Sequence, residues 1–322
     1  MTLLAAPVHS KTVVYLCPVL NKIPTRLLGV LLFASCSNGG DAVTLRLNLP
    51  ADEVRPARLT VSSVASLRIG AKADLHLDMV GDMHQVFGQE ADGLTPVTLN
   101  LDSLNLDFRI EQGIIKSSDI EEAMDVDVSS LEEGYAGRSV VLVYDHRARV
   151  QRIEGLEDDL SPEIIDSLTN GLANVEKLLG GDFFERLAGF FAVLPEEAVR
   201  PGDEWKNDFR QEILGLPVIL ENEYRFAERE NGLAHIDVSG SFATDTLRIE
   251  PGTIEFPFEG FSFAQDQISV LLKGTQTGRI SVDETTGWTR ESNLQQKFSI
   301  EFRMGLITLP VTLDNTIRLE PR

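Results

Sequence analysis

Three side chains that could hold a metal ion alternate along one short stretch of the chain: Asp74, His76 and Asp78. In a β-strand, successive side chains point to opposite faces, so these three would share one face. Carboxylate and imidazole groups gathered there could bind zinc or a similar cation. The alternative is a solvated polar face opposite Leu75 and Leu77. We favour this alternative because no further ligand group stands at a diagnostic spacing, and the sequence therefore predicts no metal.

Motifs that would assign an enzymatic reaction are absent from the sequence. It has no Gly-x-Ser-x-Gly elbow, no His-Glu-x-x-His pair and no phosphate-binding glycine loop. Its acidic clusters lack the Asp-x-Asp-x-Asp-Gly pattern of a calcium loop. Paired carboxylates for hydrolysis need no local motif, so an enzyme stays open as a third interpretation. No cofactor and no catalytic residue are predicted.

Cys36 is the residue whose surroundings best support a covalent modification. It follows a short apolar run that closes in Ala34-Ser35, and Lys22 and Arg26 provide positive charge before that run. The run is far shorter than the roughly 20 residues that span a bilayer. A positive region, an apolar run and small residues before the cut are the parts of a secretory signal. The alternative is a buried strand or helix that ends in a free cysteine.

This arrangement resembles the lipobox of bacterial lipoproteins, in which acyl chains are attached to the cysteine. The resemblance implies a signal peptide over residues 1–35, of which residues 1–19 are a candidate start-site artefact, and a tether over residues 36–41 that begins with acylated Cys36. The predicted partner is then a membrane, and the predicted location is the cell envelope. Ser37 after the cysteine resembles lipoproteins sent to the outer membrane, facing the periplasm, if the host is Gram-negative.

Composition limits the other partners. The 322 residues carry a net charge of −21, which repels phosphate backbones, so nucleic acid is not a predicted partner. The two cysteines are Cys17 and Cys36, and only Cys36 lies outside the predicted signal peptide. No disulfide is therefore expected, and the domain must be stabilised by its core alone.

Apolar and polar residues alternate over several stretches, which predicts a mainly β fold of the α+β class. The clearest stretches are residues 43–49, 74–79, 97–108 and 311–319, with a one-residue slip of the alternation inside 97–108. A period of two with one polar face is typical of antiparallel sheets that are buried on one side.

Turn signals separate further alternating runs. Asn231-Gly232 is a strong hairpin signal, because both residues accept the positive φ angles of tight hairpin turns. Residues 144–147 and 283–287 also stand between alternating runs. We therefore expect hairpins at all three places.

One segment, residues 161–194, has helical rather than alternating periodicity. Ser161-Pro162 is a helix-start signal, and Gly180-Gly181 interrupts the apolar spacing, so two helices are predicted. The second helix is rich in phenylalanine, and another aromatic strip lies within residues 254–263. We favour core packing for both, and the alternative is that they line a ligand cavity. The candidate lining residues are Phe183, Phe184, Leu187, Phe190, Phe191, Phe256, Phe258, Phe261 and Phe263.

These elements predict a single large β-rich domain over residues 42–322. It would be a curved or partly closed antiparallel sheet with the helical pair of residues 161–194 packed centrally against it. A faint twofold pattern leaves a second organisation open, in which two similar halves, residues 42–158 and 195–322, are joined by the helices.

Two short motifs resemble a known family. They are the sequence Pro-Gly-Asp-Glu-Trp at residues 201–205 and Asp-x-x-Thr-Gly-Trp at residues 283–288. In this order they resemble an uncharacterised bacterial lipoprotein family, a domain of unknown function, which implies architecture and location only. Physically, the first is typical of a tight turn that delivers an aromatic anchor into a strand. The second is typical of a hairpin in which glycine takes a positive φ.

The sequence thus predicts a non-catalytic envelope lipoprotein that binds an apolar ligand or lipid, since such ligands need a largely apolar concave pocket. The predicted shape resembles lipid-binding lipoproteins of the lipoprotein-carrier type, an analogy of fold that does not fix function. The alternative is a structural or assembly lipoprotein that contacts other envelope proteins.

Overall fold

The structure of the chain is a computed structural model. It describes residues 41–69, 71–111, 132–133, 135–155, 191–213, 216–244, 247–249, 268–304 and 307–322. These residues fall within one compact unit, Asp41–Arg322.

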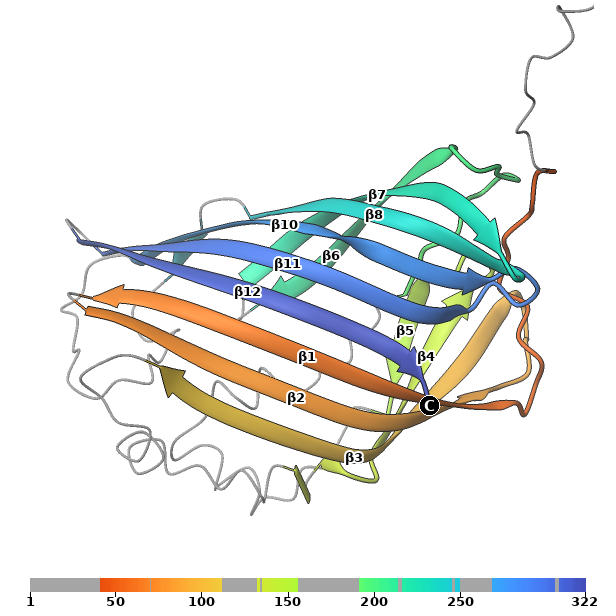
Figure 1. Ribbon diagram of the computed structural model, residues 1–322, viewed down its shortest axis with the longest axis horizontal. Coiled ribbons are helices and arrows are strands. Elements are labelled where there is room, and N and C mark those ends of the chain that lie inside the picture. The colour runs from red at the N-terminus through yellow and green to blue at the C-terminus, as the bar shows by residue number, and fades with distance from the viewer. Residues whose placement is uncertain are drawn as a thin grey trace, which may run out of the picture. The chain divides into compact units, whose positions relative to one another are not determined.

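The regular elements of the described residues are strands of one antiparallel sheet (Figure 1). A short helical turn ends at Tyr135, where the Ala136 amide donates to the Glu132 carbonyl over 3.0 Å. The strands are β1 (Val54–Ile69), β2 (Ala71–Phe87), β3 (Leu94–Glu111), β4 (Ser139–Asp145), β5 (Val150–Glu154), β6 (Glu204–Ile213), β7 (Leu216–Glu230), β8 (Leu233–Ala243), β9 (Leu247–Ile249), β10 (Ile268–Asp283), β11 (Thr289–Met304) and β12 (Ile307–Pro321).

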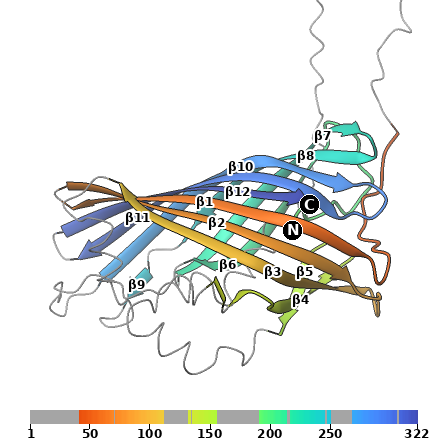
Figure 2. The same cartoon turned by 60° about the horizontal axis from the view of Figure 1, so that its bottom comes forward.

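The sheet consists of two meanders that meet through the first and last strands. Its order is β5-β4-β3-β2-β1-β12-β11-β10-β8-β7-β6, and β9 adds a short pairing to β10. Strands β1 to β3 and β10 to β12 are 15 to 18 residues long, well beyond the ordinary five or six. In both views of the ribbon, β6 and β7 pass behind these long strands, so the sheet curls over one of its faces (Figure 2).

Alternation along the strands confirms the predicted β pattern. On β11, the even positions Leu294, Gln296, Phe298 and Ile300 are buried, while the odd positions between them are exposed. The predicted slip is a β-bulge: Asp82 pairs with Ser103 and Met83 pairs with Leu101, which leaves Asp102 as an extra residue. A bulge shifts the side-chain register by one. The buried face therefore passes from odd to even positions within β3.

The three expected hairpins and both turn motifs are confirmed. Asn231 and Gly232 join β7 to β8 with φ angles of 53° and 79°. Residues 145–150 connect β4 to β5, and residues 283–289 connect β10 to β11, where Gly287 has φ 67°. Gly202, with φ 102°, precedes β6 and its anchor Trp205.

The prediction of a sheet with a central helical pair is wrong. The fold is one open antiparallel sheet, and in the described part of the chain its curled strands form the core without a helical pair packed against them. Of the helical segment 161–194, only residues 191–194 are described, and they run as non-helical chain. A helical period is a local preference, whereas the core here comes from pairing of distant strands. Across the described elements, no helix has the length and hydropathy to cross a membrane.

The stretch 43–49 is also not the strand that its alternation predicts. Leu45 and Leu47 are buried as expected, yet the backbone makes only an isolated bridge, between Val43 and Val199. Farther along, the Leu47 amide donates to the His146 carbonyl over 2.9 Å. Alternation reports which side chains are buried, but it does not supply a neighbouring strand. This stretch lies across the sheet's end instead of in the sheet.

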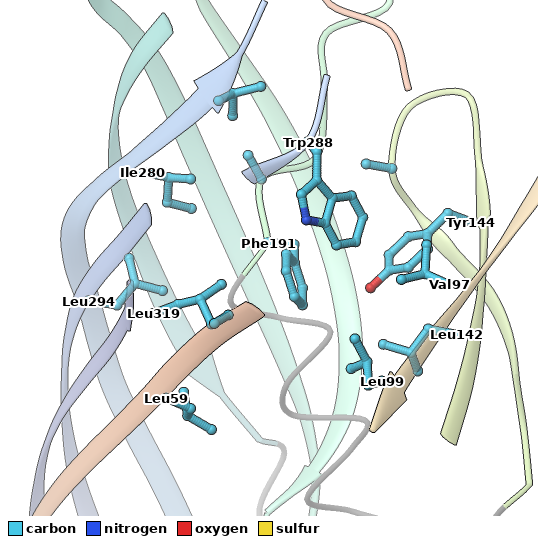
Figure 3. Packing of buried hydrophobic residues seen from close by; sticks show 14 of the residues in the cluster. Leu59, Val97, Leu99, Leu142, Tyr144, Phe191, Ile280, Trp288, Leu294 and Leu319 are labelled. Carbon is cyan, nitrogen blue, oxygen red and sulfur yellow. The ribbon is translucent and has the colours of Figure 1, made fainter. Parts of the chain in front are cut away.

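The core is densest at the end of the sheet where the β10–β11 hairpin carries Trp288, here called the Trp288 end. The centroid of the Trp288 ring lies 4.9 Å from the ring centroid of Phe191, 5.3 Å from that of Phe87 and 5.4 Å from that of Tyr144. Figure 3 shows Trp288 and Phe191 between two walls, one with Ile280 and one with the residues of β3 and β4. The aromatic side chains thus fill the space that the curl of the sheet encloses.

The segment 191–199 holds this end together. The Leu194 amide donates to the Arg147 carbonyl over 2.8 Å, and the Arg147 Nε donates back to the Leu194 carbonyl over 3.0 Å. Trp205 at the start of β6 donates its indole N–H to the Val193 carbonyl over 2.7 Å. The segment therefore connects the β4–β5 hairpin at one edge of the sheet with β6 at the other.

Candidate ligand-binding face

The inner face of the sheet is the face that carries the core, and along β2 and β12 its burial falls with distance from Trp288. On β12 its members are the odd positions from 309 to 319. Leu319 and Ile317 near the Trp288 end are 3% and 2% exposed, whereas Leu313 and Val311 are half-buried. On β2, Leu75 is 38% exposed. The end of the inner face away from Trp288 is thus apolar but incompletely covered.

A row of amide side chains crosses the middle of this face. Strand pairing aligns Asn222 with Gly240, Gly240 with Gln276, Gln276 with Gln296, and Gln296 with Asn315. Gln296 donates to Gln276 over 2.7 Å, Gln276 to Asn222 over 3.3 Å, and Asn315 to Gln296 over 3.4 Å. We call Asn222, Gln276, Gln296 and Asn315 the amide row.

Gly240 makes this row possible. Asn222 and Gln276 lie on β7 and β10, with β8 between them. A methyl group added at Gly240 would lie 2.2 Å from the Asn222 Oδ1, the atom that accepts the hydrogen bond from Gln276. Because Gly240 has no side chain, the two amides can meet over β8. The row is therefore continuous across the strands that form the curl.

An apolar row follows the amide row on the side away from Trp288. Its members are Phe209, Leu220, Phe242, Phe298 and Leu313, which the strand register brings into line through Gly274. The rings of Phe242 and Phe298 lie 4.6 Å apart. Leu220, Phe242 and Phe298 belong to a second core cluster, against which half-buried Phe209 and Leu313 pack.

The chemistry of this face is that of an apolar surface with one polar stripe. Buried amides are costly unless they are hydrogen-bonded, and the amide row satisfies most of its members internally. The Asn315 Oδ1 is the exception: it is buried and has no hydrogen-bond partner among the described residues. The face can therefore cover an apolar chain by contact, and it offers one acceptor to a hydroxyl or amide donor.

The candidate metal ligands Asp74, His76 and Asp78 lie on the opposite, outer face. The Ser66 hydroxyl donates to Asp74 and the Ser62 hydroxyl to Asp78, each over 2.5 Å. No three His, Cys, Asp or Glu side chains in the described parts of the chain are grouped to hold a metal ion. These side chains serve as cross-strand partners on a solvated surface.

Hydrogen bonding lowers the pKa of the Asp78 carboxyl. The Ser62 hydroxyl contributes most, and the Arg109 guanidinium, which also forms an ion pair with Asp78, adds to the effect. Both stabilise the charged carboxylate. The charged carboxylate of Asp78 is therefore already bound by Ser62 on β1 and Arg109 on β3.

Of the candidate lining residues, the structure describes Phe191. It is 4% exposed and packs against Trp288 and Tyr144 at the Trp288 end. Outside the described residues lie Cys36 and the candidates Phe183, Phe184, Leu187, Phe190, Phe256, Phe258, Phe261 and Phe263. The acylation of Cys36 and the contact of the other residues with a ligand stay predictions.

The amide row is the feature that sequence reasoning missed. Its signal was present, because Gln296 and Asn315 each occupy a position where alternation demands an apolar residue. Gln296 stands between Leu294 and Phe298 on β11, for example. A polar residue in phase with a buried face is a candidate for a buried hydrogen bond. Its partners could not be named without the strand order.

Comparison with known families gives one match. A family of unknown function (DUF6263) matches residues 92–289, which extend from just before β3 to the beginning of β11 and include both turn motifs. The expected resemblance to an uncharacterised family is thereby confirmed, whereas its lipoprotein character stays a prediction. No curated protein matches the chain in sequence.

Solved structures show distant likenesses. A lipovitellin structure that concerns lipid–protein interactions is 11% identical, with a TM-score of 0.47 over 85% of this chain and 25% of that chain. Pseudomonas aeruginosa OpdQ is 6% identical, with a TM-score of 0.24 over 84% and 99% of the two chains. Salmonella typhi OmpF in complex with daunomycin is 9% identical, with a TM-score of 0.22 over 85% and 99%. This chain spans a quarter of the lipovitellin chain, and likenesses at these scores fix neither fold nor function.

Proposed function

We propose that this chain, which belongs to the family of unknown function DUF6263, binds an apolar ligand or lipid on the inner face of its sheet. The observation that carries the proposal is the gradient of burial along that face. On β12 its apolar side chains are buried near Trp288 and half-buried beyond the amide row, and on β2 Leu75 is 38% exposed, whereas Leu220, Phe242 and Phe298 between the strands' ends stay buried. Large apolar side chains that share one incompletely covered face mark a binding surface.

The inner face is divided into two parts by the amide row. The sealed cluster around Trp288 supplies stability, and the second cluster beyond the amide row has half-buried members on β6, β11 and β12. An alkyl chain laid on this second part would remove apolar surface from water, at about 25 cal/mol per Å² buried. The ligand would therefore gain affinity without disturbing the core.

Native mass spectrometry of the detergent-free protein tests the proposal. We expect a bound mass in the lipid range, or uptake of added fatty acid. Leu313→Asp and Leu75→Asp place a charge on the half-buried part of the inner face and should reduce occupancy at least about tenfold, since an unpaired charge against an apolar ligand is costly.

The matched control is Thr312→Asp, which puts the same charge one residue away on the exposed outer face of β12. It should leave occupancy unchanged. Circular dichroism confirms that each variant is folded. A protein that carries no apolar ligand and takes up none would refute the proposal and favour the alternative role in protein contacts of the envelope.

We further propose, from the sequence pattern at Cys36, that the domain is tethered to an envelope membrane by acylation of this cysteine. Multiple acyl chains hold a protein stably at a bilayer, each buried methylene contributing about 0.8 kcal/mol. Intact-mass measurement of protein extracted from membranes should show the acyl groups, and Cys36→Ser should abolish them. An unmodified Cys36 in membrane-extracted protein would contradict this proposal.

A further inference from the structure

A small pocket lies at the Trp288 end, where β1 begins and β12 ends. Its volume is about 110 Å³. Trp288 and Arg290 line the pocket from the β10–β11 hairpin and the start of β11. Arg55 and Arg322 line it from the start of β1 and the end of β12. At about 30 Å³ per water molecule, the space has room for roughly four, which is the scale of a carboxylate or phosphate group.

Gln85 presents an unused donor in this pocket. Its side chain is 2% exposed, and its Oε1 accepts the indole N–H of Trp288 over 2.8 Å. Because an indole N–H can only donate, it fixes the orientation of the Gln85 amide. The Gln85 Nε2 is then left buried, with no hydrogen-bond partner among the described residues.

Arg55 presents a second unused donor directly across the strand pair, since Arg55 on β1 pairs with Gln85 on β2. Its Nε donates to the Glu53 carboxylate over 2.5 Å, and its guanidinium lies 5.0 Å from the Phe87 ring centroid. Its Nη1 is buried and likewise finds no partner in the described part of the chain. Buried donors without acceptors are rare and costly, so a missing acceptor is indicated.

The charges around the pocket favour an anion. Its lining residues include Arg55, Arg290 and Arg322 and no Asp or Glu, although the whole chain carries a net charge of −21. Two nearby carboxylates are engaged: Glu53 with Arg55, and Asp82 with Arg322 over 3.1 Å.

Arg290 is the guanidinium left for a ligand. No carboxylate lies within ion-pair distance of it among the described residues.

We propose that this pocket binds an oxyanion, a carboxylate or phosphate group, through the Gln85 Nε2 and the guanidinium groups of Arg55 and Arg290. The planar arginine side chain offers paired donors that match the oxygens of such groups. The pocket lies near the Trp288 end of the inner face, away from the apolar row and its half-buried members Phe209 and Leu313. This assignment therefore stands independently of apolar-ligand binding there.

Thermal unfolding of the full chain tests the proposal, with inorganic phosphate and acetate as probes and sodium chloride at equal ionic strength as the reference. A ligand that binds the folded state raises the midpoint of unfolding. At least one probe should raise it above the chloride reference. Arg290→Gln should weaken the binding of that probe about tenfold, the usual effect of losing a charged hydrogen bond.

The matched control is Arg318→Gln, which removes an exposed arginine from the outer face of β12 outside the pocket. It should bind the probe as the parent chain does. If Arg290→Gln does not fold, Arg290→Lys replaces it, because lysine keeps the positive charge but lacks the paired donors of the guanidinium group. Equal binding by the Arg290 variant, or equal loss in the Arg318 control, overturns the proposal.

A second arm identifies the source of the oxyanion. The chain is mixed with vesicles of phosphatidylcholine, alone or with phosphatidic acid. If the chain binds vesicles that contain phosphatidic acid but not vesicles of pure phosphatidylcholine, and Arg290→Gln reduces this binding, the oxyanion is a lipid headgroup. A response to free phosphate or acetate without vesicle binding assigns a soluble anion. No response to any of these probes refutes the site.

Discussion

Single residues decide where polar groups can meet on the inner face. Gly240 leaves the space in which Asn222 and Gln276 bond over β8, so a missing side chain completes a hydrogen-bond network. Gly287 acts similarly at the Trp288 hairpin, where it has φ 67° and an added methyl would lie 2.2 Å from the Arg46 carbonyl oxygen. Both positions are fixed by close approach of distant parts of the chain.

Gly240→Ala tests this role. The added methyl would displace the Asn222 amide, break its bond with Gln276 and leave buried polar atoms unsatisfied. We expect a loss of about 1–3 kcal/mol in the free energy of unfolding, measured by denaturant titration.

Two variants control for other causes. Ser241→Ala changes an exposed neighbour on the same strand and should have little effect. Adding Asn222→Ala to Gly240→Ala removes the clash, so the two losses should be less than additive. Additive losses would contradict the direct contact between these positions.

Local sequence signals identified many elements because those elements are locally determined. Asn231-Gly232, the Gly287 turn and the slip near Asp102 depend on residues within a few positions, and each is present as expected. The stretch 43–49 failed as a strand because its alternation reflects burial at the sheet's end. The prediction of a central helical pair was wrong because the spacing of apolar residues does not show that the core forms by pairing of distant strands.

The β4–β5 hairpin is an element stabilised by one carboxylate. Asp145 accepts hydrogen bonds from the amides of Arg147 and Arg149, over 2.8 and 3.0 Å, and from the Arg149 Nε over 2.7 Å. Burial raises the pKa of the Asp145 carboxyl, but these bonds outweigh burial and lower the pKa below its usual value of 3.8. The folded state therefore favours the charged carboxylate.

Asp145→Asn should destabilise the protein by about 2 kcal/mol at pH 7, because hydrogen bonds to a charged acceptor are lost. A lowered folded-state pKa contributes stability above the unfolded pKa, and this contribution is lost as pH falls through the folded value. The difference between the parent chain and the variant should therefore shrink below about pH 4. Denaturant titrations at several pH values measure it.

Asp107→Asn is the control, since that side chain is 63% exposed in an ion pair with Arg109. Exposed pairs contribute little, so its effect should be small. A difference for Asp145→Asn that stays constant from pH 7 to pH 3 would be inconsistent with a charged, hydrogen-bonded carboxylate.

At the scale of the whole described unit, the two meanders depend on pairing between β1 and β12. Residues 57–67 of β1 pair with residues 311–321 of β12, so the inner face becomes continuous only when the two ends of the unit meet. No local pattern encodes such a pairing. The amide row, the apolar row and the oxyanion pocket all draw on strands far apart in sequence, which explains why sequence reasoning found their residue types but not their assembly.

The same pairing gives the unit two different surfaces. The outer face carries cross-strand polar pairs, such as Arg58 with Asp82 over 2.7 Å, whereas the inner face is apolar and less covered away from Trp288. The protein carries a net charge of −21, yet its inner face is suited to an uncharged alkyl chain. We therefore expect an apolar ligand to contact the inner face and not the outer face.

Photolabelling shows which face an apolar ligand contacts. A fatty acid with an aliphatic diazirine is mixed with the protein and illuminated, and the labelled positions are mapped by peptide mass spectrometry. Side chains alternate between the two faces of β12, so label should fall on Val311 and Leu313 and be absent from Thr312 and Asp314. Label on the outward positions at the same level, or no label on β12, would contradict binding to the inner face.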